Sequence, residues 1–160
     1  MRKLFPIIAI SAMALSGCDS SVVWHKSDDK DAMTDKITRS YSNHSVSGTP
    51  AKIEIACSKG GKIYFYYEFP SREGIPSLML PQTAKIRFDN EKPHDVHWNN
   101  DYASGESEPE DVDAFFKKIS GKNKFTIEVF DGGKSSFDIT GIDDALAGMH
   151  EVGCPKSDSE

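Results

Sequence analysis

Three cysteines, Cys18, Cys57 and Cys154, are the residues of this 160-residue chain whose chemistry is easiest to state. A thiol can be acylated, can form a disulfide with a second thiol, or can bind a metal ion together with other thiols and imidazoles. Cys18 ends an apolar run near the N-terminus, whereas Cys57 and Cys154 lie far apart in a polar remainder. Neither of these two has a neighbouring cysteine or a suitably spaced histidine to complete a zinc site, so the sequence favours lipid on the first and a disulfide between the others.

The N-terminal residues predict export. Arg2 and Lys3 precede a mostly apolar segment, residues 4–15, which is shorter than the about 20 residues that a membrane-spanning helix needs. A positive start, a short apolar centre and a small-residue exit are typical of a secretory signal peptide. The ending Leu15-Ser16-Gly17-Cys18 resembles the bacterial lipobox, in which the signal is cut before a cysteine that then carries lipid such as palmitate. We predict a lipoprotein signal peptide over residues 1–17; the alternative is an ordinary signal peptide with an incidental cysteine.

Lipid on Cys18 would place the protein at a bacterial membrane, facing the periplasm. Several acyl chains hold a soluble domain firmly, since each buried CH₂ contributes about 0.8 kcal/mol. Asp19, directly after the lipidated cysteine, resembles the signal that retains enterobacterial lipoproteins in the inner membrane. Ser20 is not among the strongest residues at the next position, so the outer membrane remains an alternative. We expect no cofactor other than this covalent lipid.

The charge of the chain excludes one class of partner. Removal of Arg2 and Lys3 with the signal changes the net charge from −6 to −8, and the remaining 143 residues fit one domain. Nucleic-acid binding depends on lysine and arginine neutralising phosphates, so we expect no nucleic-acid partner. The same charge disfavours adhesion to anionic headgroups, and the predicted membrane contact therefore depends on the lipid.

Cys57 and Cys154 are predicted to form a disulfide, because exported proteins meet an oxidising compartment. The closed loop of about 98 residues would stabilise the fold by about 4–5 kcal/mol on the chain-entropy account. The alternative is a pair of separate buried thiols.

Composition divides the mature chain into three parts. Residues 18–50 are predicted to be a lipidated polar tether and entry segment, with Trp24 packed on the domain edge. Residues 51–155 are predicted to be a strand-rich globular domain, and residues 156–160 a polar tail.

Hydrophobic periodicity predicts a strand-rich α+β fold. Apolar residues alternate in two Gly-linked hairpins and in further strands, over residues 53–57 with 63–69, 77–80, 84–88 with 96–98, and 125–129 with 135–139. Helical spacing marks residues 112–119, ended by Gly121, and residues 142–149. We predict six or seven mostly antiparallel strands in a β-sandwich or open barrel, with one mid-chain helix and one short C-terminal helix.

The sequence gives no sign of an enzyme or a metal site. The Gly-x-Ser-x-Gly elbow of serine hydrolases is absent, and a chance carboxylate pair among 25 acids is no evidence for a glycosidase. His94 and His97 lie three apart on a predicted strand, where such residues point to opposite faces. The segment from Asp29 begins like a calcium loop but has Thr34 and Ser40 at the positions of the required Gly and Glu.

A binding surface is the remaining hypothesis for the domain. Aromatic residues are enriched at the cores of protein interfaces. The candidates are Tyr64, Tyr66, Trp98 and Tyr102. The alternative for each is burial, or packing at the domain edge.

The order of several short motifs resembles a family of small exported proteins associated with type VI secretion, the TagO/VasI-like proteins. The likeness covers about residues 24–154 and rests on Trp24 before Asp31-Ala32-Met33-Thr34-Asp35, on Ile55-Ala56-Cys57-Ser58-Lys59-Gly60-Gly61, on Arg87-Phe88-Asp89 leading to Trp98, on Phe137-Asp138-Ile139-Thr140-Gly141-Ile142, and on the final Cys154. The resemblance implies a cysteine-bridged envelope domain and supplies no reaction.

We therefore expect a non-catalytic, membrane-anchored lipoprotein that binds a protein partner of the cell envelope. A secretion machine and a prophage-encoded surface modifier are the two settings that this hypothesis allows. The alternative is an inhibitor of lysozyme or of another wall-degrading enzyme, since an acidic domain suits a basic lysozyme.

Overall fold

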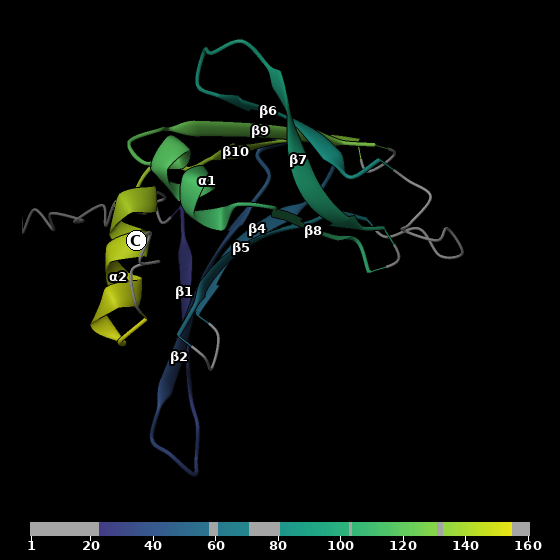
Figure 1. Ribbon diagram of the computed structural model, residues 1–160. Coiled ribbons are helices and arrows are strands. Elements are labelled where there is room, and N and C mark those ends of the chain that lie inside the picture. The colour runs from purple at the N-terminus through teal and green to yellow at the C-terminus, as the bar shows by residue number, and fades with distance from the viewer. Residues whose placement is uncertain (1–22, 58–60, 71–80, 103, 131–132, 155–160) are drawn as a thin grey trace, which may run out of the picture.

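The computed structural model describes residues 23–57, 61–70, 81–102, 104–130 and 133–154 (Figure 1). Within these ranges the elements are β1 (His25–Lys30), β2 (Ile37–His44), β3 (Ser47–Gly48), β4 (Lys52–Cys57), β5 (Ile63–Glu68), β6 (Thr83–Phe88), β7 (His94–Asp101), β8 (Glu106–Pro109), α1 (Val112–Ile119), β9 (Lys124–Val129), β10 (Gly133–Asp138) and α2 (Ile142–Glu151). The signal segment with Cys18, the predicted strand at residues 77–80 and the predicted tail at 156–160 lie outside the described residues.

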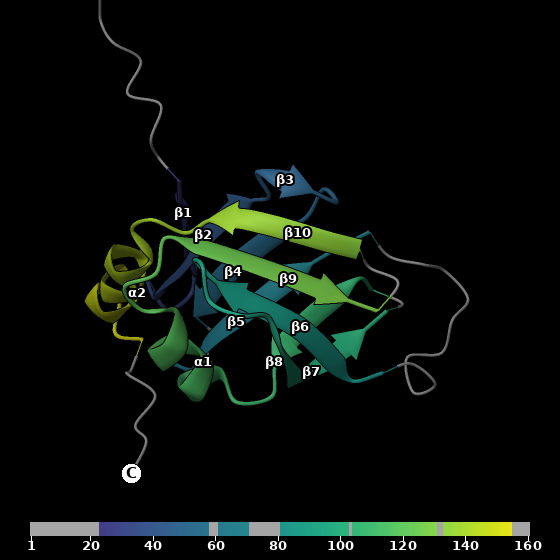
Figure 2. The same ribbon diagram turned by 90° about the horizontal axis from the view of Figure 1, so that it is seen from above.

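The strands form two antiparallel layers joined by one long strand. The order is β1-β2-β4-β5-β8-β7-β6-β9-β10-β3. The first half of β7 pairs with β6, and its second half pairs with β8. We call the layer of β1, β2, β4, β5, β8 and the second half of β7 sheet A, and the layer of the first half of β7, β6, β9, β10 and β3 sheet B; Figure 2 shows sheet B lying over sheet A. The predicted α+β fold with a β-sandwich or open barrel and two helices is confirmed.

Asn100 supports β7 at the point where it leaves β6 for β8. Its buried side-chain amide donates to the carbonyl oxygens of Pro81 and Thr83, at 3.0 and 3.1 Å. The Asn100 backbone N–H donates to Oε1 of Gln82 at 2.6 Å. Ser107 Oγ in turn donates to Oδ1 of Asn100. Side chains thus replace the ladder hydrogen bonds lost at the crossing, as buried polar groups require.

The inner faces of the two sheets enclose an aromatic core. Phe115 of α1 lies 4.6 Å from Phe65 of sheet A and 5.6 Å from Phe125 of sheet B, measured between ring centroids. Phe88 and Trp98 complete this cluster, at 5.9 and 5.3 Å from Phe115. Offset and edge-on ring pairs of this kind add to the stabilisation from burial.

Helix α1 closes one end of the sandwich, as its periodicity predicts. Its first turn is capped by Asp111, whose Oδ1 accepts a hydrogen bond from the Ala114 backbone N–H at 2.9 Å. Phe115 and Ile119 are buried, and the helix ends at Ile119. Lys117 and Lys118 lie in the last turn, where the helix dipole favours positive charge.

Helix α2 lies at the same end of the molecule, packed on β2 and β4 (Figure 1). Gly148 lies on its buried side, and a Cβ there would collide with the Tyr41 hydroxyl, so glycine is needed for this close approach. Just past the helix, Cys154 forms a disulfide with Cys57 at the end of β4, with a Cα–Cα distance of 6.1 Å. The predicted disulfide is confirmed, and it ties α2 to sheet A.

The predicted boundary at residue 50 is wrong, because strands β1, β2 and β3 lie within the segment predicted as tether. Strand β2 pairs with β1 on one side and with β4 on the other. The inward positions of β2 include the polar residues Arg39 and Asn43, which are 7% and 5% exposed. An apolar alternation is therefore missing there, and sequence periodicity could not reveal the strand. Trp24 is buried in the core, close to the predicted packing at the domain edge.

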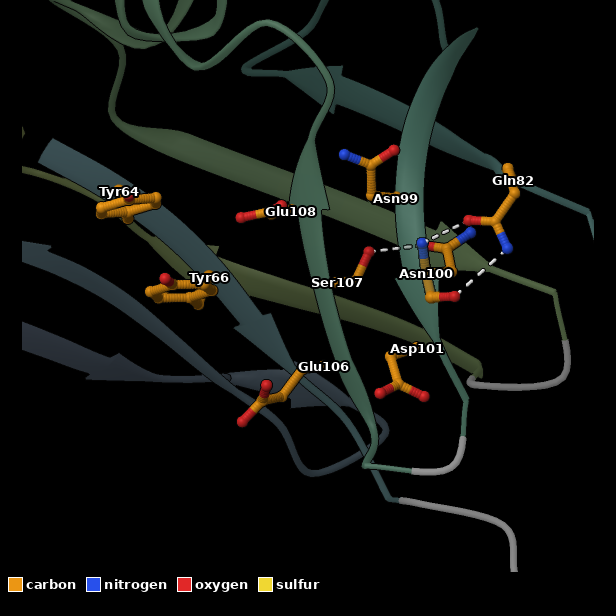
Figure 3. Close-up of a pocket in the computed structure, with 9 residues that line it drawn as sticks. All are labelled: Tyr64, Tyr66, Gln82, Asn99, Asn100, Asp101, Glu106, Ser107 and Glu108. Carbon is orange, nitrogen blue, oxygen red and sulfur yellow. Dashed lines mark hydrogen bonds between the residues drawn. The ribbon is translucent and has the colours of Figure 1, made fainter. Parts of the chain in front are cut away.

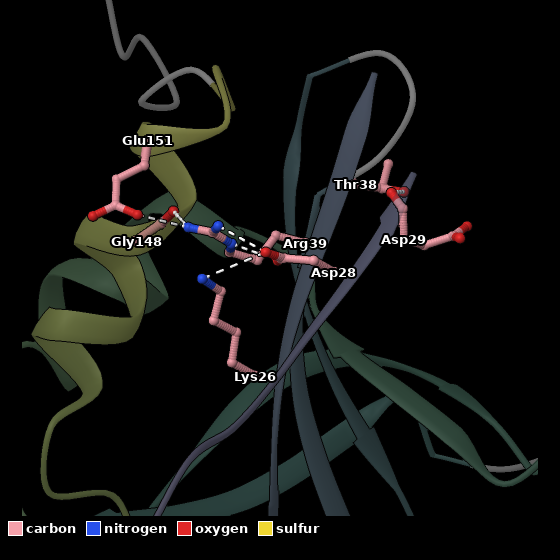
Figure 4. A network of polar contacts seen from close by, with 7 residues as sticks. All are labelled: Lys26, Asp28, Asp29, Thr38, Arg39, Gly148 and Glu151. Carbon is pink, nitrogen blue, oxygen red and sulfur yellow. Dashed lines mark hydrogen bonds and ion pairs between the residues drawn. The ribbon is translucent and has the colours of Figure 1, made fainter. Parts of the chain in front are cut away.

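Arg39 joins β1 and β2 to α2 (Figure 4). Its Nε and Nη2 donate to the two carboxylate oxygens of Asp28, at 2.7 and 2.9 Å. Its Nη1 donates to the Gly148 carbonyl oxygen at 2.7 Å and to the Glu151 carboxylate at 2.8 Å. The hydrogen bond from Arg39 holds the pKa of Asp28 below its usual value. A bidentate contact of this type fixes geometry as well as charge.

Loss of the disulfide is expected to destabilise the fold. Cys57→Ser or Cys154→Ser should lower the free energy of unfolding by about 4–5 kcal/mol, because the bridge restricts the unfolded chain over a long loop. Thermal melting of the oxidised wild type and of both variants measures the effect. Equal melting temperatures would contradict a stabilising role for the bridge.

Asp28→Asn is expected to lower the melting temperature at neutral pH, because buried Arg39 then loses its bidentate carboxylate. The depressed pKa of Asp28 fixes the sign: its contribution is complete above the ordinary aspartate value of 3.8 and is lost as pH falls through the lower folded value. The difference in melting temperature between variant and wild type should therefore shrink in acid. Asp29→Asn, on the other face of β1, is the matched control and should melt like the wild type at each pH.

Candidate functional site

The outward face of sheet A carries the candidate site. Alternate residues of a strand point to opposite faces, and the inward residues of β5 and β8 are in the core. The outward residues of the four neighbouring strands β4, β5, β8 and β7 form what we call the tyrosine face: Lys52, Glu54, Tyr64, Tyr66, Glu68, Asn99, Asp101, Glu106 and Glu108.

Tyr64 and Tyr66 form the aromatic part of this face. They lie two residues apart on β5, so their side chains point the same way, and both are half-buried. Their rings stack with centroids 5.7 Å apart and planes inclined by 7°. Ala56 lies opposite Tyr64 on β4. The two rings stand stacked on the outward side of β5.

A pocket of about 410 Å³ opens beside these rings (Figure 3). Its walls come from β5, β7 and β8, together with Gln82 before β6. Asn100 and Ser107 are buried, and their hydrogen bond to each other helps to fix the base of the pocket. The lining residues are Tyr64, Tyr66, Gln82, Asn99, Asn100, Asp101, Glu106, Ser107 and Glu108.

The charge of the tyrosine face is distributed unevenly. Lys52 Nζ contacts the carboxylates of Glu54 and Glu68, at 2.8 and 2.7 Å. Burial disfavours the charged form of Lys52, but its hydrogen bonds to these two carboxylates outweigh that effect and raise its pKa. Within the part of the chain that the structure describes, Glu106 and Glu108 make no ion pair. The pocket side of the face therefore carries the uncompensated negative charge.

The pKa of the Tyr66 hydroxyl is sensitive to this charge. Burial is the larger cause that raises its pKa above the ordinary tyrosine value, and the negative charge of Glu108 adds to it. Both effects disfavour the phenolate. The Tyr66 hydroxyl therefore stays neutral over the physiological range and is a hydrogen-bond donor and acceptor at the pocket.

Two of the four predicted surface aromatics are on this face, and two are not. The structure buries Trp98 and Tyr102, which are 1% and 3% exposed, and so corrects that part of the prediction. Trp98 packs in the aromatic cluster of the core because it follows the inward parity of β7. The Tyr102 hydroxyl donates to the Pro81 carbonyl oxygen at 2.9 Å, which satisfies its polar end.

The sequence analysis missed the acids of the site, because it assigned no strand to residues 101–110. They lie on β8, a strand of four residues, and at the end of β7. The signal was present in the alternation of exposed Glu106, buried Ser107, half-buried Glu108 and buried Pro109. Serine and proline are weak markers of an inward face, so this alternation is visible only once the pairing with β5 and β7 is known.

The structure also places the two histidines that the sequence analysis considered as metal ligands. His94 and His97 are both exposed on β7. Among the described residues, no group of three or more His, Cys, Asp or Glu side chains is placed to hold a metal ion. The same residues include no helix that is both long and apolar enough to cross a bilayer.

Comparison with protein-family models, curated proteins and solved structures finds no match to this chain, so the TagO/VasI-like resemblance stays a prediction.

The arrangement is suited to recognition of cations. Carboxylates accept charge-assisted hydrogen bonds from ammonium and guanidinium groups. The faces of tyrosine rings attract the same cations through the ring quadrupole. Both kinds of group meet at the pocket beside Tyr66.

Glu108→Gln is expected to lower the pKa of Tyr66 toward its ordinary value of 10.0, because it removes a negative charge that opposes the phenolate. The shift should be partial, since burial remains. Titration of tyrosine Cζ signals by NMR measures it, with Tyr66→Phe to assign the signal. Glu128→Gln, on the outer face of sheet B, should leave the titration unchanged; an unchanged Tyr66 in Glu108→Gln would contradict the electrostatic contact.

Proposed function

We propose that this protein is a bacterial lipoprotein whose non-catalytic domain binds a protein partner of the cell envelope through the tyrosine face. The observation that carries the proposal is the outward stacked pair Tyr64 and Tyr66 beside an open pocket. The core does not need these two rings, because the inward faces of sheets A and B already enclose it. Exposed aromatic residues at a concave surface are typical of interface centres.

The lipid on Cys18 would hold this domain close to the bilayer. Val23, which packs against the core, lies five residues after Cys18. Even a fully extended chain of that length reaches only about 18 Å. Sheet A would therefore stand near the headgroups with β1 as its first strand, and the bidentate contact of Arg39 to Asp28 would keep β1 on the domain. Such a connection would be shorter than the tether predicted from composition.

The setting that we propose is a bacterial envelope, with type VI secretion or a prophage as the source of the partner. The motif order from Trp24 to Cys154 supports the secretion setting through its resemblance to the TagO/VasI-like proteins. The periplasmic location is supported by the signal-like N-terminus and by the disulfide, which requires an oxidising compartment. Asp19 favours the inner membrane.

A second candidate function is inhibition of lysozyme or another wall-degrading enzyme. The uncompensated carboxylates of Glu106 and Glu108 favour it, because complementary charge speeds and orients association with a basic enzyme. An inhibition assay with the purified protein separates this function from simple partner binding.

Cys18→Ala is expected to abolish lipidation and to release the protein from membranes. The wild type should incorporate labelled palmitate in cells and should sediment with the membrane fraction, whereas the variant should do neither. Asp19→Ser is the matched control: it should keep the label and should move the protein toward the outer membrane. Palmitate labelling that persists in Cys18→Ala, or an intact N-terminus in the mass spectrum of the native protein, would refute the anchor.

A further inference from the structure

Three carboxylates of the tyrosine face lie in one row across three adjacent strands. Glu106 of β8 is the direct cross-strand partner of Glu68 on β5. On its other side, Glu106 is the direct partner of Asp101 on β7. Like charges directly opposite one another destabilise a sheet. The free protein therefore carries an electrostatic cost at this row, and a bound cation would remove it.

Glu68 and Glu106 differ in how their charge is compensated. Lys52 contacts Glu68 at 2.7 Å but is shared with Glu54. Among the residues that the structure describes, no lysine or arginine forms an ion pair with Glu106 or with its neighbour Glu108. Asp101 accepts a weak hydrogen bond from the Ser104 backbone N–H at 3.4 Å.

The aromatic rings lie next to this row. Tyr64, Tyr66 and Glu108 all line the pocket (Figure 3). Burial raises the pKa of Tyr66, and the negative charge of Glu108 adds to that effect. A long basic side chain lying over Tyr66 would bury its methylene stem on the ring and place its charged head among the carboxylates.

We propose that the tyrosine face binds the basic surface of a partner protein, with a lysine or arginine side chain of the partner entering the pocket between Tyr66 and Glu106. The inference rests on the proposed function, since it names the partner class of that binding domain. The net charge of −6 on the whole chain would steer such a partner over a longer range.

A protein fits this face better than a small cation does. A free polyamine would neutralise the row of carboxylates but would leave the ring of Tyr64 exposed to water. A metal ion has no cluster of three ligands to bind among the described residues. A protein surface that presents basic residues with apolar neighbours can cover both the charged row and the two rings.

The first test measures binding with purified components. Full-length protein, held through a C-terminal tag so that lipidation does not affect the measurement, is exposed to a basic lysozyme, to an acidic protein of similar size, and to spermidine. We expect lysozyme to bind with an affinity that falls steeply with salt, and the acidic protein not to bind. Glu106→Gln with Glu108→Gln should weaken binding by about tenfold or more. Asp95→Asn with Glu128→Gln, which removes the same charge from sheet B, should bind like the wild type.

Two further measurements exclude loss of folding as the cause. Glu106→Gln alone should raise the melting temperature, because it relieves repulsion from both neighbouring strands. Tyr64→Ala with Tyr66→Ala should weaken lysozyme binding, whereas Phe130→Ala, which removes another exposed aromatic ring, should not. A stable Glu106 and Glu108 double variant that binds lysozyme as well as the wild type would overturn the proposal, as would spermidine binding without lysozyme binding.

Site-specific photocrosslinking in cells separates this inference from the proposed function on which it rests. A crosslinker at position 64 should capture a partner with a basic surface, and a crosslinker at position 130 should not. Capture at 130 alone would overturn the tyrosine face as the interface while leaving a binding domain in place. Capture at neither position would overturn both, and the palmitate label on Cys18 would still report the anchor.

Discussion

The double pairing of β7 is the constraint on which the rest of the structure depends. One strand pairs with β6 in sheet B and then with β8 in sheet A, and so sets the distance and angle between the two layers. The crossing is stable because Asn100 and Gln82 supply the hydrogen bonds that the interrupted ladder lacks. The same crossing brings the end of β7 beside β8 and β5, and the candidate site forms from these three strands. The polar side chains of Asn100 and Gln82 therefore support both the fold and the candidate site.

A second set of restraints acts on the other edge of sheet A. The disulfide joins β4 to the chain after α2, and Arg39 joins β1 and β2 to α2 through Asp28 and Glu151. One restraint is covalent and acts mainly on the unfolded chain, whereas the other is electrostatic and depends on pH. Together they keep the N-terminal strands on the domain.

The tyrosine face differs from the rest of sheet A in a consistent way. Inward positions are mostly apolar, whereas the outward positions combine stacked rings with opposed carboxylates. Folding alone does not favour opposed carboxylates, since a single glutamine at position 106 would remove the repulsion. Binding sites commonly retain arrangements that cost stability in the free protein. Carboxylates and tyrosine rings therefore meet at one pocket on this face.

The sequence by itself determined the parts of this protein that have a clear period or a covalent identity. Alternation at residues 53–57 and 63–69, helical spacing at 112–119 and 142–149, and an oxidised pair of cysteines all follow from side-chain types at fixed intervals. Only the tertiary structure decided the role of Arg39 and Asn43, because polar residues face inward on β2 only when α2 and neighbouring backbone groups satisfy them. The tertiary structure also decided that Trp98 is buried in the core and that Glu106 lies between two acidic residues of the neighbouring strands. Those outcomes depend on which strands are neighbours, and strand order is a long-range property that local periodicity does not encode.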